Sequence, residues 1–308
     1  MTFESILQIG SFPDDLQGMI DAQFRACSEV EVLADDGLRQ QIRAIITRSN
    51  CTIEAAQLGA LPNLKVVATS GVGFDGIPLD AARARQVVVT NTPDVLNDAV
   101  CELALGLLLA LLRQIPAADR YVRDGSWQQA PFGMGTGLAG KRVGIVGLGR
   151  IGKGIARRLE SFGVTLAYTG SKPQPQVAYA FFPDALALAG FADILIVSCR
   201  GGDATRHLIN ADVLRQLGPD GFLVNVARGS VVDEPALIGA LESGAIRGAA
   251  LDVFDTEPLA DSPLRALPNT VLTPHVASAT TETRRAMMRL ALDNIARVLA
   301  GEAPLTPV

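Results

Sequence analysis

The sequence predicts an α/β fold with two parallel-sheet domains, one of which is inserted into the other. Apolar strand-like runs and helix-like segments alternate along most of the 308 residues, which is the pattern of parallel strands joined by crossover helices. A glycine-rich turn lies near the middle of the chain, directly after one of the apolar runs. The chain is also long enough for two domains of ordinary size.

The first 97 residues form one complete series of alternating elements. Short apolar runs predict strands at 6–9, 30–33, 44–47, 65–69 and 87–90. Helical stretches are expected between them at 15–25, 52–61 and 78–85. A parallel sheet with helices on both faces therefore precedes the glycine-rich turn.

The remaining residues predict a second parallel sheet and a closing helix. An apolar helix at 97–113, for which core packing is expected, leads into a second helical piece that reaches Tyr121. Strands are then expected at 165–169, 194–198, 222–226, 248–253 and 270–273. The helices between them are expected at 185–189, 211–216 and 234–243, with a final helix at about 281–300. The expected domains are 1–97 plus 285–308, and 98–284.

Composition disfavours several classes of protein. The net charge of −5 and the pI of about 5.2 disfavour a nucleic-acid or anionic-membrane partner. The apolar segment 103–112 is shorter than the roughly 20 residues of a membrane span, and no signal peptide is expected at the N-terminus. Four scattered cysteines without a C-x-x-C pair predict free thiols in the cytoplasm and no metal site.

The glycine-rich turn has the spacing of a dinucleotide-binding motif. Residues 143–146 predict a buried strand, and Gly147, Gly149 and Gly152 follow at the start of a helix over 151–162. The first glycine makes the tight turn, the second lets a pyrophosphate approach, and the third lets helix pack on strand. The helix N-terminus offers N–H groups to the phosphates. The expected architecture is two Rossmann-like or flavodoxin-like domains, with the dinucleotide-binding one inserted in the other.

The end of the second strand of this domain bears on the choice of cofactor. An Asp or Glu there binds the ribose 2′-hydroxyl of NAD, but this chain has Thr169, Gly170, Ser171 and Lys172. A hydroxyl and an ammonium can donate hydrogen bonds to a 2′-phosphate, and no carboxylate repels it. Ser171 and Lys172 therefore favour NADP (NADPH). NAD is the alternative, if Lys172 is only a solvated turn lysine.

Three ionisable residues follow three different predicted strands of the second sheet. Arg228, Glu257 and His275 each come after an apolar strand, and the carboxyl ends of parallel strands face the ligand crevice. Reduction of a carbonyl by hydride transfer needs a proton donor, a cation that polarises the carbonyl and a carboxylate that orients the donor. The other histidine, His207, lies in a polar connection and is expected to be a solvated or capping residue.

On these residues the chain resembles the D-isomer-specific 2-hydroxyacid dehydrogenases, and within them the glyoxylate/hydroxypyruvate reductase branch. The matching segments are the glycine-rich turn and residues 70–79, 225–237, 248–259 and 273–284. The resemblance implies an NADPH-dependent reductase of small 2-oxo acids that forms D-2-hydroxy acids, and a homodimer. It also implies that the discontinuous domain binds the substrate and that the inserted domain binds the dinucleotide.

The resemblance implies roles for individual residues at the substrate. His275 would be the acid, Glu257 its partner, and Arg228 would hold carboxylate and carbonyl oxygens. The backbone N–H groups of Val72 and Gly73 would hold the substrate carboxylate. The order Arg, Glu, His separates the chain from formate dehydrogenases, which pair Gln with the histidine.

Further roles are implied at the cofactor. Asp252 would lie beside the nicotinamide carboxamide, and the backbone near Arg150 and Ile151 would meet the pyrophosphate. The sequence leaves the roles of two further residues open. Arg200 contacts the cofactor or faces solvent, and Trp127 reaches a partner subunit's substrate pocket or is an interface or core aromatic.

Two alternative functions stand beside this one. The first is an NAD-dependent D-2-hydroxyacid dehydrogenase of another substrate class, such as 3-phosphoglycerate, which the missing NAD acid and the lack of a following regulatory domain disfavour. The second is a dinucleotide-sensing binding protein that resembles the C-terminal-binding-protein corepressors. A long disordered tail and a basic region are expected of that class, and neither is found in the sequence.

Overall fold

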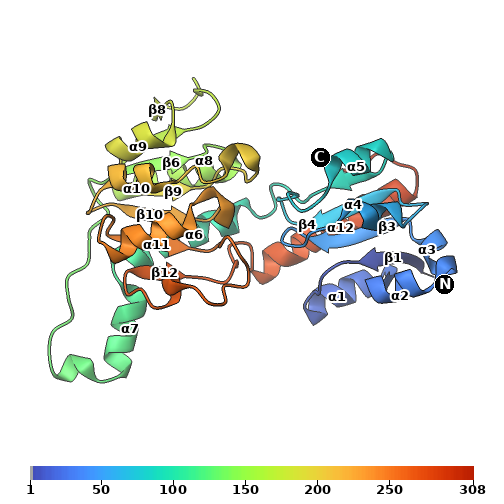
Figure 1. The fold of residues 1–308 in the computed structure, drawn as a ribbon, viewed down its shortest axis with the longest axis horizontal. Helices are drawn as coiled ribbons and strands as arrows, with labels where there is room; N and C mark the ends of the chain where they lie inside the picture. The colour runs from blue at the N-terminus through green and yellow to red at the C-terminus, as the bar shows by residue number, and fades with distance from the viewer. Residues whose placement is uncertain (1–2) are drawn as a thin grey trace. The chain divides into compact units, whose positions relative to one another are not determined.

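The computed structural model describes residues 3–308 and divides into two compact units (Figure 1). Unit 1 extends to Leu96 and resumes at Ser278–Val308, and unit 2 is Asn97–Ala277. Residues 1 and 2, with which the expected first domain begins, lie outside the described residues. The chain returns to unit 1 at 277/278, whereas the sequence suggests 284/285.

Unit 1 is built on a five-stranded parallel sheet in the order β2-β1-β3-β4-β5. Its strands are β1 (Glu4–Gln8), β2 (Phe24–Cys27), β3 (Ala44–Arg48), β4 (Val66–Ser70) and β5 (Val88–Thr90). In the central pair, each residue from Ala44 to Arg48 stands opposite one from Val66 to Ser70. The sheet is wholly parallel, as the alternation of elements predicts.

Helices cover both faces of this sheet. The helices α1 (Asp14–Asp21) and α12 (Thr281–Leu299) share one hydrophobic core with the sheet, in which Leu16 and Leu292 pack with Ile46. Figure 1 shows α12, from the far end of the chain, beside the blue strands. The other face carries α2 (Glu29–Ala34), α3 (Asp36–Gln41), α4 (Ala55–Gly59) and α5 (Leu79–Ala84).

Residues 30–33 are helical, so the expectation of a strand there is wrong. The strand is Phe24–Cys27, partly inside a stretch expected to be helical. After this strand, valine alternates with glutamate, which resembles the pattern of a further strand. Ser28 and Glu31, however, form a capping box. The Ser28 hydroxyl accepts the N–H of Glu31 at 3.3 Å, and the Glu31 carboxylate accepts the N–H of Ser28 at 2.7 Å. This pair starts a helix that buries Val32.

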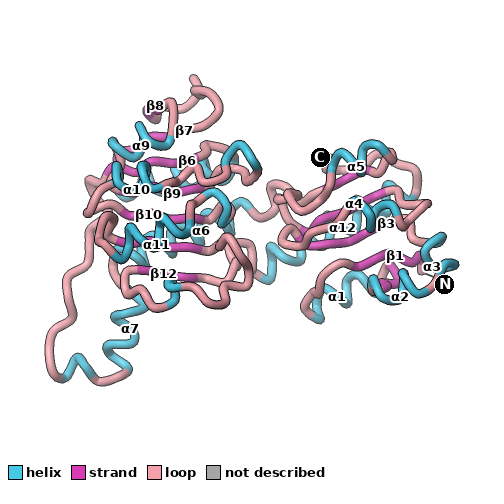
Figure 2. The backbone as a smooth tube through the Cα atoms, viewed as in Figure 1, coloured by secondary structure: helices cyan, strands magenta, loops and turns pink. Residues whose placement is uncertain are grey.

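Unit 2 is built on a seven-stranded parallel sheet in the order β12-β11-β10-β9-β6-β7-β8 (Figure 2). Its strands are β6 (Arg142–Val146), β7 (Thr165–Thr169), β8 (Ala180–Phe182), β9 (Ile194–Val197), β10 (Phe222–Asn225), β11 (Gly248–Leu251) and β12 (Thr270–Leu272). The strand order reverses between β6 and β9, and in open α/β sheets this switch point is where ligands bind. The short edge strand β8 was not expected.

Helices also cover both faces of the second sheet. The helices α9 (Ala185–Phe191), α10 (Ala211–Leu217) and α11 (Glu234–Glu242) share one core around Leu188, Leu214 and Leu237. On the opposite face α6 (Asn97–Leu112) packs against α8 (Arg150–Leu159). The remaining pieces are α7 (Ile115–Arg123) and the 3₁₀ turns η1 (Ser126–Gln128), η2 (Glu160–Phe162), η3 (Asp203–Thr205), η4 (Gly229–Val231) and η5 (Pro263–Arg265).

The apolar helix α6 is a core helix of unit 2. Ala104 and Leu108 are completely buried, and half of the helix faces the interior. Among residues 3–308, no single helix has both the length and the apolar character needed to cross a membrane. Only α6 and α7 taken together reach that threshold, and they are bent by 60° relative to each other.

Candidate active site

The glycine-rich turn leaves β6 at the switch point of the second sheet. Gly147 has a φ of +95°, which glycine adopts without strain, and a methyl group there would overlap the backbone of Cys199. Ser198, directly after β9, donates its hydroxyl to the carbonyl of Gly147 at 2.9 Å. A methyl group at Gly152 would overlap the same carbonyl. The turn is therefore closely packed on its protein side.

Gly149 faces the open side of the turn. Apart from its chain neighbours, no described atom lies within 4 Å of a methyl group built at Gly149. Gly149 also precedes α8, whose N-terminus has no side-chain cap. The N–H groups of Arg150 and Ile151 belong to this uncapped first turn, where the helix dipole favours an anion. These residues fit a dinucleotide pyrophosphate.

The loop after β7 is held to the glycine-rich turn. Ser171 and Lys172 are exposed in this loop, which contains no Asp or Glu. The N–H of Gln174 donates to the buried hydroxyl of Tyr168 at 2.6 Å, and its Nε2 donates to the carbonyl of Leu148 at 2.8 Å. The donors suited to a ribose 2′-phosphate are therefore tied to the turn suited to the pyrophosphate.

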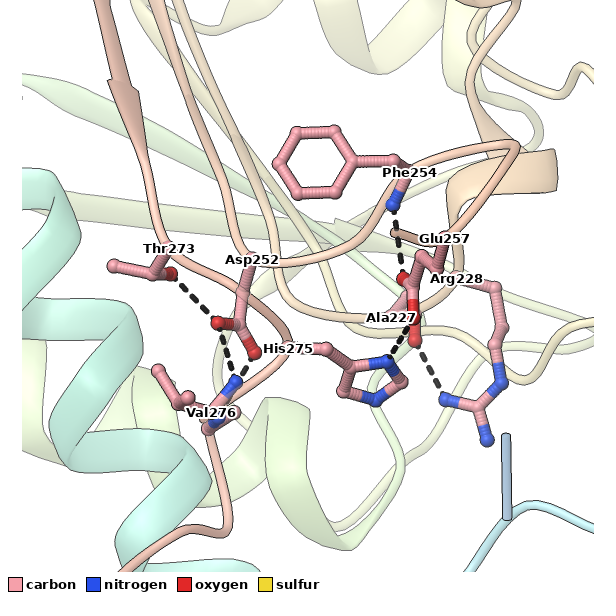
Figure 3. A network of polar contacts seen from close by, with 9 residues as sticks. Ala227, Arg228, Asp252, Phe254, Glu257, Thr273, His275 and Val276 are labelled. Atoms are coloured by element: carbon pink, nitrogen blue, oxygen red, sulfur yellow. Dashed lines mark hydrogen bonds and ion pairs between the residues drawn. The ribbon is translucent and has the colours of Figure 1, made fainter. Parts of the chain in front are cut away.

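Arg228, Glu257 and His275 lie together at the carboxyl ends of β10, β11 and β12 (Figure 3). The Nδ1 atom of His275 is 2.6 Å from Oε2 of Glu257. The other carboxylate oxygen of Glu257 accepts the N–H of Phe254 at 3.1 Å. Figure 3 shows Arg228 beside Glu257 and His275, and Nη1 of Arg228 donates to the carbonyl of Ala227 at 2.7 Å. The three side chains that the sequence singles out form one cluster.

Glu257 is held as a carboxylate. Burial by itself raises the pKa of this carboxyl, but the hydrogen bond and charge of His275, the N–H of Phe254 and the charge of Arg228 outweigh it. The net result is a pKa below the ordinary value. Glu257 can therefore orient the imidazole through Nδ1 and stabilise a positive charge on it. Nε2 is the nitrogen left for a ligand.

Asp252 organises the loop that carries His275. Its side chain is completely buried, and Oδ1 accepts the Thr273 hydroxyl at 2.6 Å and the N–H of Val276 at 2.9 Å. Oδ2 accepts the N–H of Ala277 at 2.9 Å. The sequence singled out Asp252 only through the family resemblance, at the nicotinamide. Its part in shaping the His275 loop depends on contacts that the sequence does not reveal.

The backbone of His275 is held in an uncommon conformation. Its φ is +53°, in the left-handed region that residues other than glycine seldom adopt. The carbonyl of Asp252 accepts the N–H of His275 at 2.9 Å, so the same residue holds the loop through backbone and side chain. Such conformations persist where the surrounding structure fixes them, and they concentrate at functional sites.

The second histidine, His207, is hydrogen-bonded to the turn that follows Arg228. The N–H of His207 donates to the carbonyl of Ser230 at 2.8 Å, and Nδ1 of His207 is 3.9 Å from the Asp233 carboxylate. The nearby Arg200 is exposed on the connection after β9. His207 thus has a structural contact of its own, separate from the His275–Glu257 pair.

Val72 and Gly73 lie in unit 1, in the loop after β4, and both are half-buried. Within residues 3–308, neither of their N–H groups donates a hydrogen bond to another part of the chain. Two backbone donors on consecutive residues can bind one carboxylate. The loop therefore has the chemistry that the family resemblance implies for it.

Trp127 is not a core aromatic. It lies in η1 and is 66% exposed, and Ile115 and Val122 of the preceding α7 are exposed as well. No residue of α7 is buried. Of the interpretations that the sequence left open, an interface position and a position at a partner subunit's pocket therefore remain.

All four cysteines are free, and burial raises the pKa of the Cys199 thiol to about 11. In the part of the chain that the structure describes, no group of three His, Cys, Asp or Glu side chains could hold a metal ion.

A Rossmann-type sheet with an uncapped glycine turn at its switch point, and a His–Glu pair beside an Arg at the same edge, defines a nicotinamide-dinucleotide-dependent dehydrogenase. Comparison with known proteins narrows this class. Residues 105–277 match the family model of the D-isomer specific 2-hydroxyacid dehydrogenase, NAD binding domain. The chain belongs to the D-isomer-specific 2-hydroxyacid dehydrogenases and is an NAD(P)-dependent oxidoreductase.

Relatives within the family are similar over most of their length. The chain is 45% identical over 270 residues to a glyoxylate/hydroxypyruvate reductase A of Arabidopsis thaliana, covering 88% of this chain and 86% of the relative. It is 44% identical over 269 residues to a hydroxyphenylpyruvate reductase of Plectranthus scutellarioides, covering 87% and 86%.

Solved structures agree in fold. An NADPH-dependent glyoxylate/hydroxypyruvate reductase from Sinorhizobium meliloti, in complex with NADP and malonate, matches with a TM-score of 0.92 at 40% identity. The match covers 100% of this chain and 97% of that one. The family and the two-sheet α/β fold expected from the sequence are thereby confirmed.

Proposed function

We propose that this chain reduces small 2-oxo acids, such as glyoxylate or hydroxypyruvate, to D-2-hydroxy acids, with NADPH as the preferred reductant. The observation that carries the proposal is the pairing of His275 with an ionised Glu257 beside Arg228. Relatives named glyoxylate/hydroxypyruvate reductases, at 40–45% identity, support the substrate class. The absence of an acid from the loop after β7 supports NADPH over NADH.

The chemistry follows from the positions of the charged groups. When bound, a reduced nicotinamide supplies the hydride that adds to the 2-oxo carbon. His275 donates a proton from Nε2 to the carbonyl oxygen, and Glu257 stabilises the imidazolium before that transfer. Arg228 polarises the carbonyl and holds the substrate carboxylate with its planar, permanently charged guanidinium. The N–H groups of Val72 and Gly73 bind the carboxylate as well.

The cofactor contacts follow from the glycine-rich turn. Gly147, Gly149 and Gly152 shape the turn, and the N–H groups of Arg150 and Ile151 receive the pyrophosphate. Ser171 and Lys172 bind the ribose 2′-phosphate. A further contact of Asp252 with the nicotinamide carboxamide, as the family resemblance implies, adds to its part in holding the His275 loop.

We assign dinucleotide binding to unit 2 and substrate binding to unit 1. The enzyme acts as a homodimer, and the exposed apolar side chains of α7 and η1, at Ile115, Val122 and Trp127, support a subunit interface there. Shielding such a surface by a second subunit removes apolar area from water.

The test is a panel of 2-oxo acids followed by absorbance at 340 nm with NADPH and NADH in parallel. The panel contains glyoxylate, hydroxypyruvate, hydroxyphenylpyruvate and 2-ketogluconate, since relatives named for the larger acids are about as similar as those named for the smaller ones. We expect the highest kcat/KM for glyoxylate or hydroxypyruvate with NADPH. Oxidation of neither cofactor with any of these acids would overturn the proposal.

A further inference from the structure

The C-terminal tail of the chain closes the free edge of the sheet in unit 1. Thr306 accepts the N–H of Asn91 through its carbonyl at 3.2 Å, and the N–H of Val308 donates to the carbonyl of Val89 at 2.9 Å. Thr90 and Pro307 form an antiparallel bridge between these contacts. The tail thus continues the sheet beyond β5, whose edge would otherwise present unpaired backbone groups.

A completely buried amide fixes this tail. The Oδ1 atom of Asn294, on α12, accepts the N–H groups of Leu305 at 2.8 Å and Thr306 at 3.1 Å. Its Nδ2 donates to the carbonyl of Leu290 and to the Thr306 hydroxyl, both at 2.8 Å. All four hydrogen bonds that an Asn side chain can make are formed, and a fully satisfied buried polar group specifies one arrangement of its surroundings.

The same tail holds Asn91, and Asn91 holds the loop after β4. The Thr306 hydroxyl donates to the carbonyl of Asn91 at 2.6 Å. The Nδ2 atom of Asn91 donates to the carbonyl of Val72 at 2.8 Å. The next residue, Thr92, donates its N–H to the carbonyl of Gly71 at 2.9 Å. Two successive carbonyls of the loop are therefore turned toward residues 91 and 92.

The direction of these carbonyls sets the direction of two N–H groups. In a planar trans peptide the N–H points opposite to the carbonyl of the preceding residue. Because the carbonyls of Gly71 and Val72 face residues 91 and 92, the N–H groups of Val72 and Gly73 both face away from them. The loop is also closely packed at Gly71, where an added methyl group would overlap Ser49. Two adjacent donors are thereby aimed to the same side.

We infer that Asn294, Thr306 and Asn91 are positioning residues for substrate binding, and that the C-terminal tail sets the affinity for the 2-oxo acid. Asn294 holds Thr306, Thr306 holds Asn91, and Asn91 keeps the N–H groups of Val72 and Gly73 aimed at the substrate carboxylate. The inference rests on the proposed function of that loop. The two N–H groups bind the substrate carboxylate equally strongly in the ground state and in the transition state. Loss of their alignment should therefore raise KM and leave kcat unchanged.

The first test replaces Asn91 by Asp, which keeps the shape and exchanges the donor to Val72 for an oxygen. We expect KM for glyoxylate to rise about tenfold, as for loss of a hydrogen bond that leaves a half-buried acceptor unpaired, with kcat nearly unchanged. The matched control is Asn63→Asp. Asn63 also donates Nδ2 to a backbone carbonyl, that of Gln40 at 2.8 Å, but it lies before β4, at the amino end of the sheet. Its KM should remain that of the wild type.

The second test acts on the tail without adding charge. Thr306→Val removes the hydroxyl, and we expect KM for glyoxylate to rise about fivefold, while Thr306→Ser, which keeps the hydroxyl, restores the wild-type value. The Kd of NADPH, measured by calorimetry, should be the same in all variants because unit 2 is untouched. A wild-type KM in both Thr306→Val and Asn91→Asp, or a fall in kcat at unchanged KM, overturns the inference.

Hydrogen exchange separates this inference from the proposed function. A peptide that contains Asn91 and Thr92, whose N–H groups donate to the carbonyls of Thr306 and Gly71, should exchange faster in Thr306→Val than in the wild type, and at the wild-type rate in Thr306→Ser and Asn63→Asp. This measurement needs no substrate. If the wild type reduces no 2-oxo acid, the proposed function fails, and with it the substrate-affinity part of the inference. If the exchange of Thr92, which contacts the loop, is unchanged in Thr306→Val, the coupling of tail to loop is refuted even in an active enzyme.

Discussion

The Nδ1 atom of His275 lies 2.6 Å from Oε2 of Glu257, although the two residues follow different strands of the sheet in unit 2. This contact fixes which ring nitrogen faces the carboxylate and which is presented to a ligand. The pair is an oriented acid whose partner is already ionised, because the pKa of Glu257 is held below its ordinary value.

The imidazole of His275 is expected to dominate the chemical step. Replacing His275 by Ala should lower kcat by about 10²–10⁴-fold, the usual contribution of a general acid. NADPH binding should be unaffected. The matched control is His207→Ala, which removes the only other histidine and should keep most of the wild-type kcat. Wild-type turnover in His275→Ala, measured with glyoxylate and NADPH, would falsify the assignment.

The charge of Glu257 is expected to support the chemical step. In Glu257→Gln the side chain keeps its shape, but a neutral amide replaces the carboxylate that contacts Nδ1 of His275. The kcat of glyoxylate reduction should therefore fall about 10–100-fold, as for loss of a charge-assisted hydrogen bond. The measurement is kcat at pH 7 with saturating NADPH for both proteins. Equal kcat values would show that the carboxylate has no such effect.

The same carboxyl links stability to pH. Because the pKa of Glu257 is lowered in the folded protein, its contribution to stability is fully present above the ordinary value of 4.5 and is lost as the pH falls through the lowered value. The wild type should therefore exceed Glu257→Gln in unfolding free energy at pH 7, and this difference should shrink in acid. Urea unfolding of both proteins at pH 7 and pH 4 measures it.

Asp252→Asn is expected to damage both fold and catalysis. The substitution replaces one of the two buried carboxylate oxygens by an NH₂ group, which then faces another hydrogen-bond donor. The free energy of unfolding should fall by roughly 1–3 kcal/mol as a result. The melting temperature should drop by several degrees, and kcat should fall because the His275 loop loses a fixed partner. Asp184→Asn is the control, since Asp184 caps α9 with one hydrogen bond and Asn caps about as well. Equal stability of Asp252→Asn and wild type would contradict the expected role.

Two glycines of one turn should respond differently to alanine. Gly149→Ala fills open space and should leave the melting temperature unchanged while weakening NADPH binding, because the added methyl group blocks the pyrophosphate. Gly147→Ala should lower the melting temperature, because its φ is positive and its methyl group would overlap Cys199. Calorimetry and thermal denaturation distinguish the two effects. Tight NADPH binding by Gly149→Ala would show that the cofactor lies elsewhere.

The loop after β7 should decide between the two cofactors. Removing the ammonium in Lys172→Ala should weaken NADPH binding about tenfold or more, as for loss of a charge-assisted hydrogen bond, and should leave NADH binding unchanged. Lys153→Ala, on α8, is the control for loss of a positive charge. Equal losses for NADPH and NADH in Lys172→Ala would mean that this lysine does not contact the 2′-phosphate.

Local patterns were sufficient for most of the fold. Apolar runs of strand length, such as that before Gly147, are buried on both faces of a parallel sheet and therefore stand out in the sequence. The expectation of a strand at residues 30–33 was wrong because the alternation of valine and glutamate resembles a strand pattern. The pair Ser28 and Glu31 in the same stretch is a capping box and indicates the start of a helix. The edge strand β8 is short and half-exposed, and so it carries little hydrophobic pattern.

By itself, the sequence determined most of the order of strands and helices, the glycine turn, and the identity of the residues at three strand ends. Each of these depends on side chains that are near neighbours in the chain, so spacing alone reveals them. Only the tertiary structure decided that Asp252 holds the His275 loop and that the tail reaches Val72 through Asn91. These contacts join residues from distant parts of the chain, and a hydrogen bond between them exists only once strand order and register have brought its two atoms together.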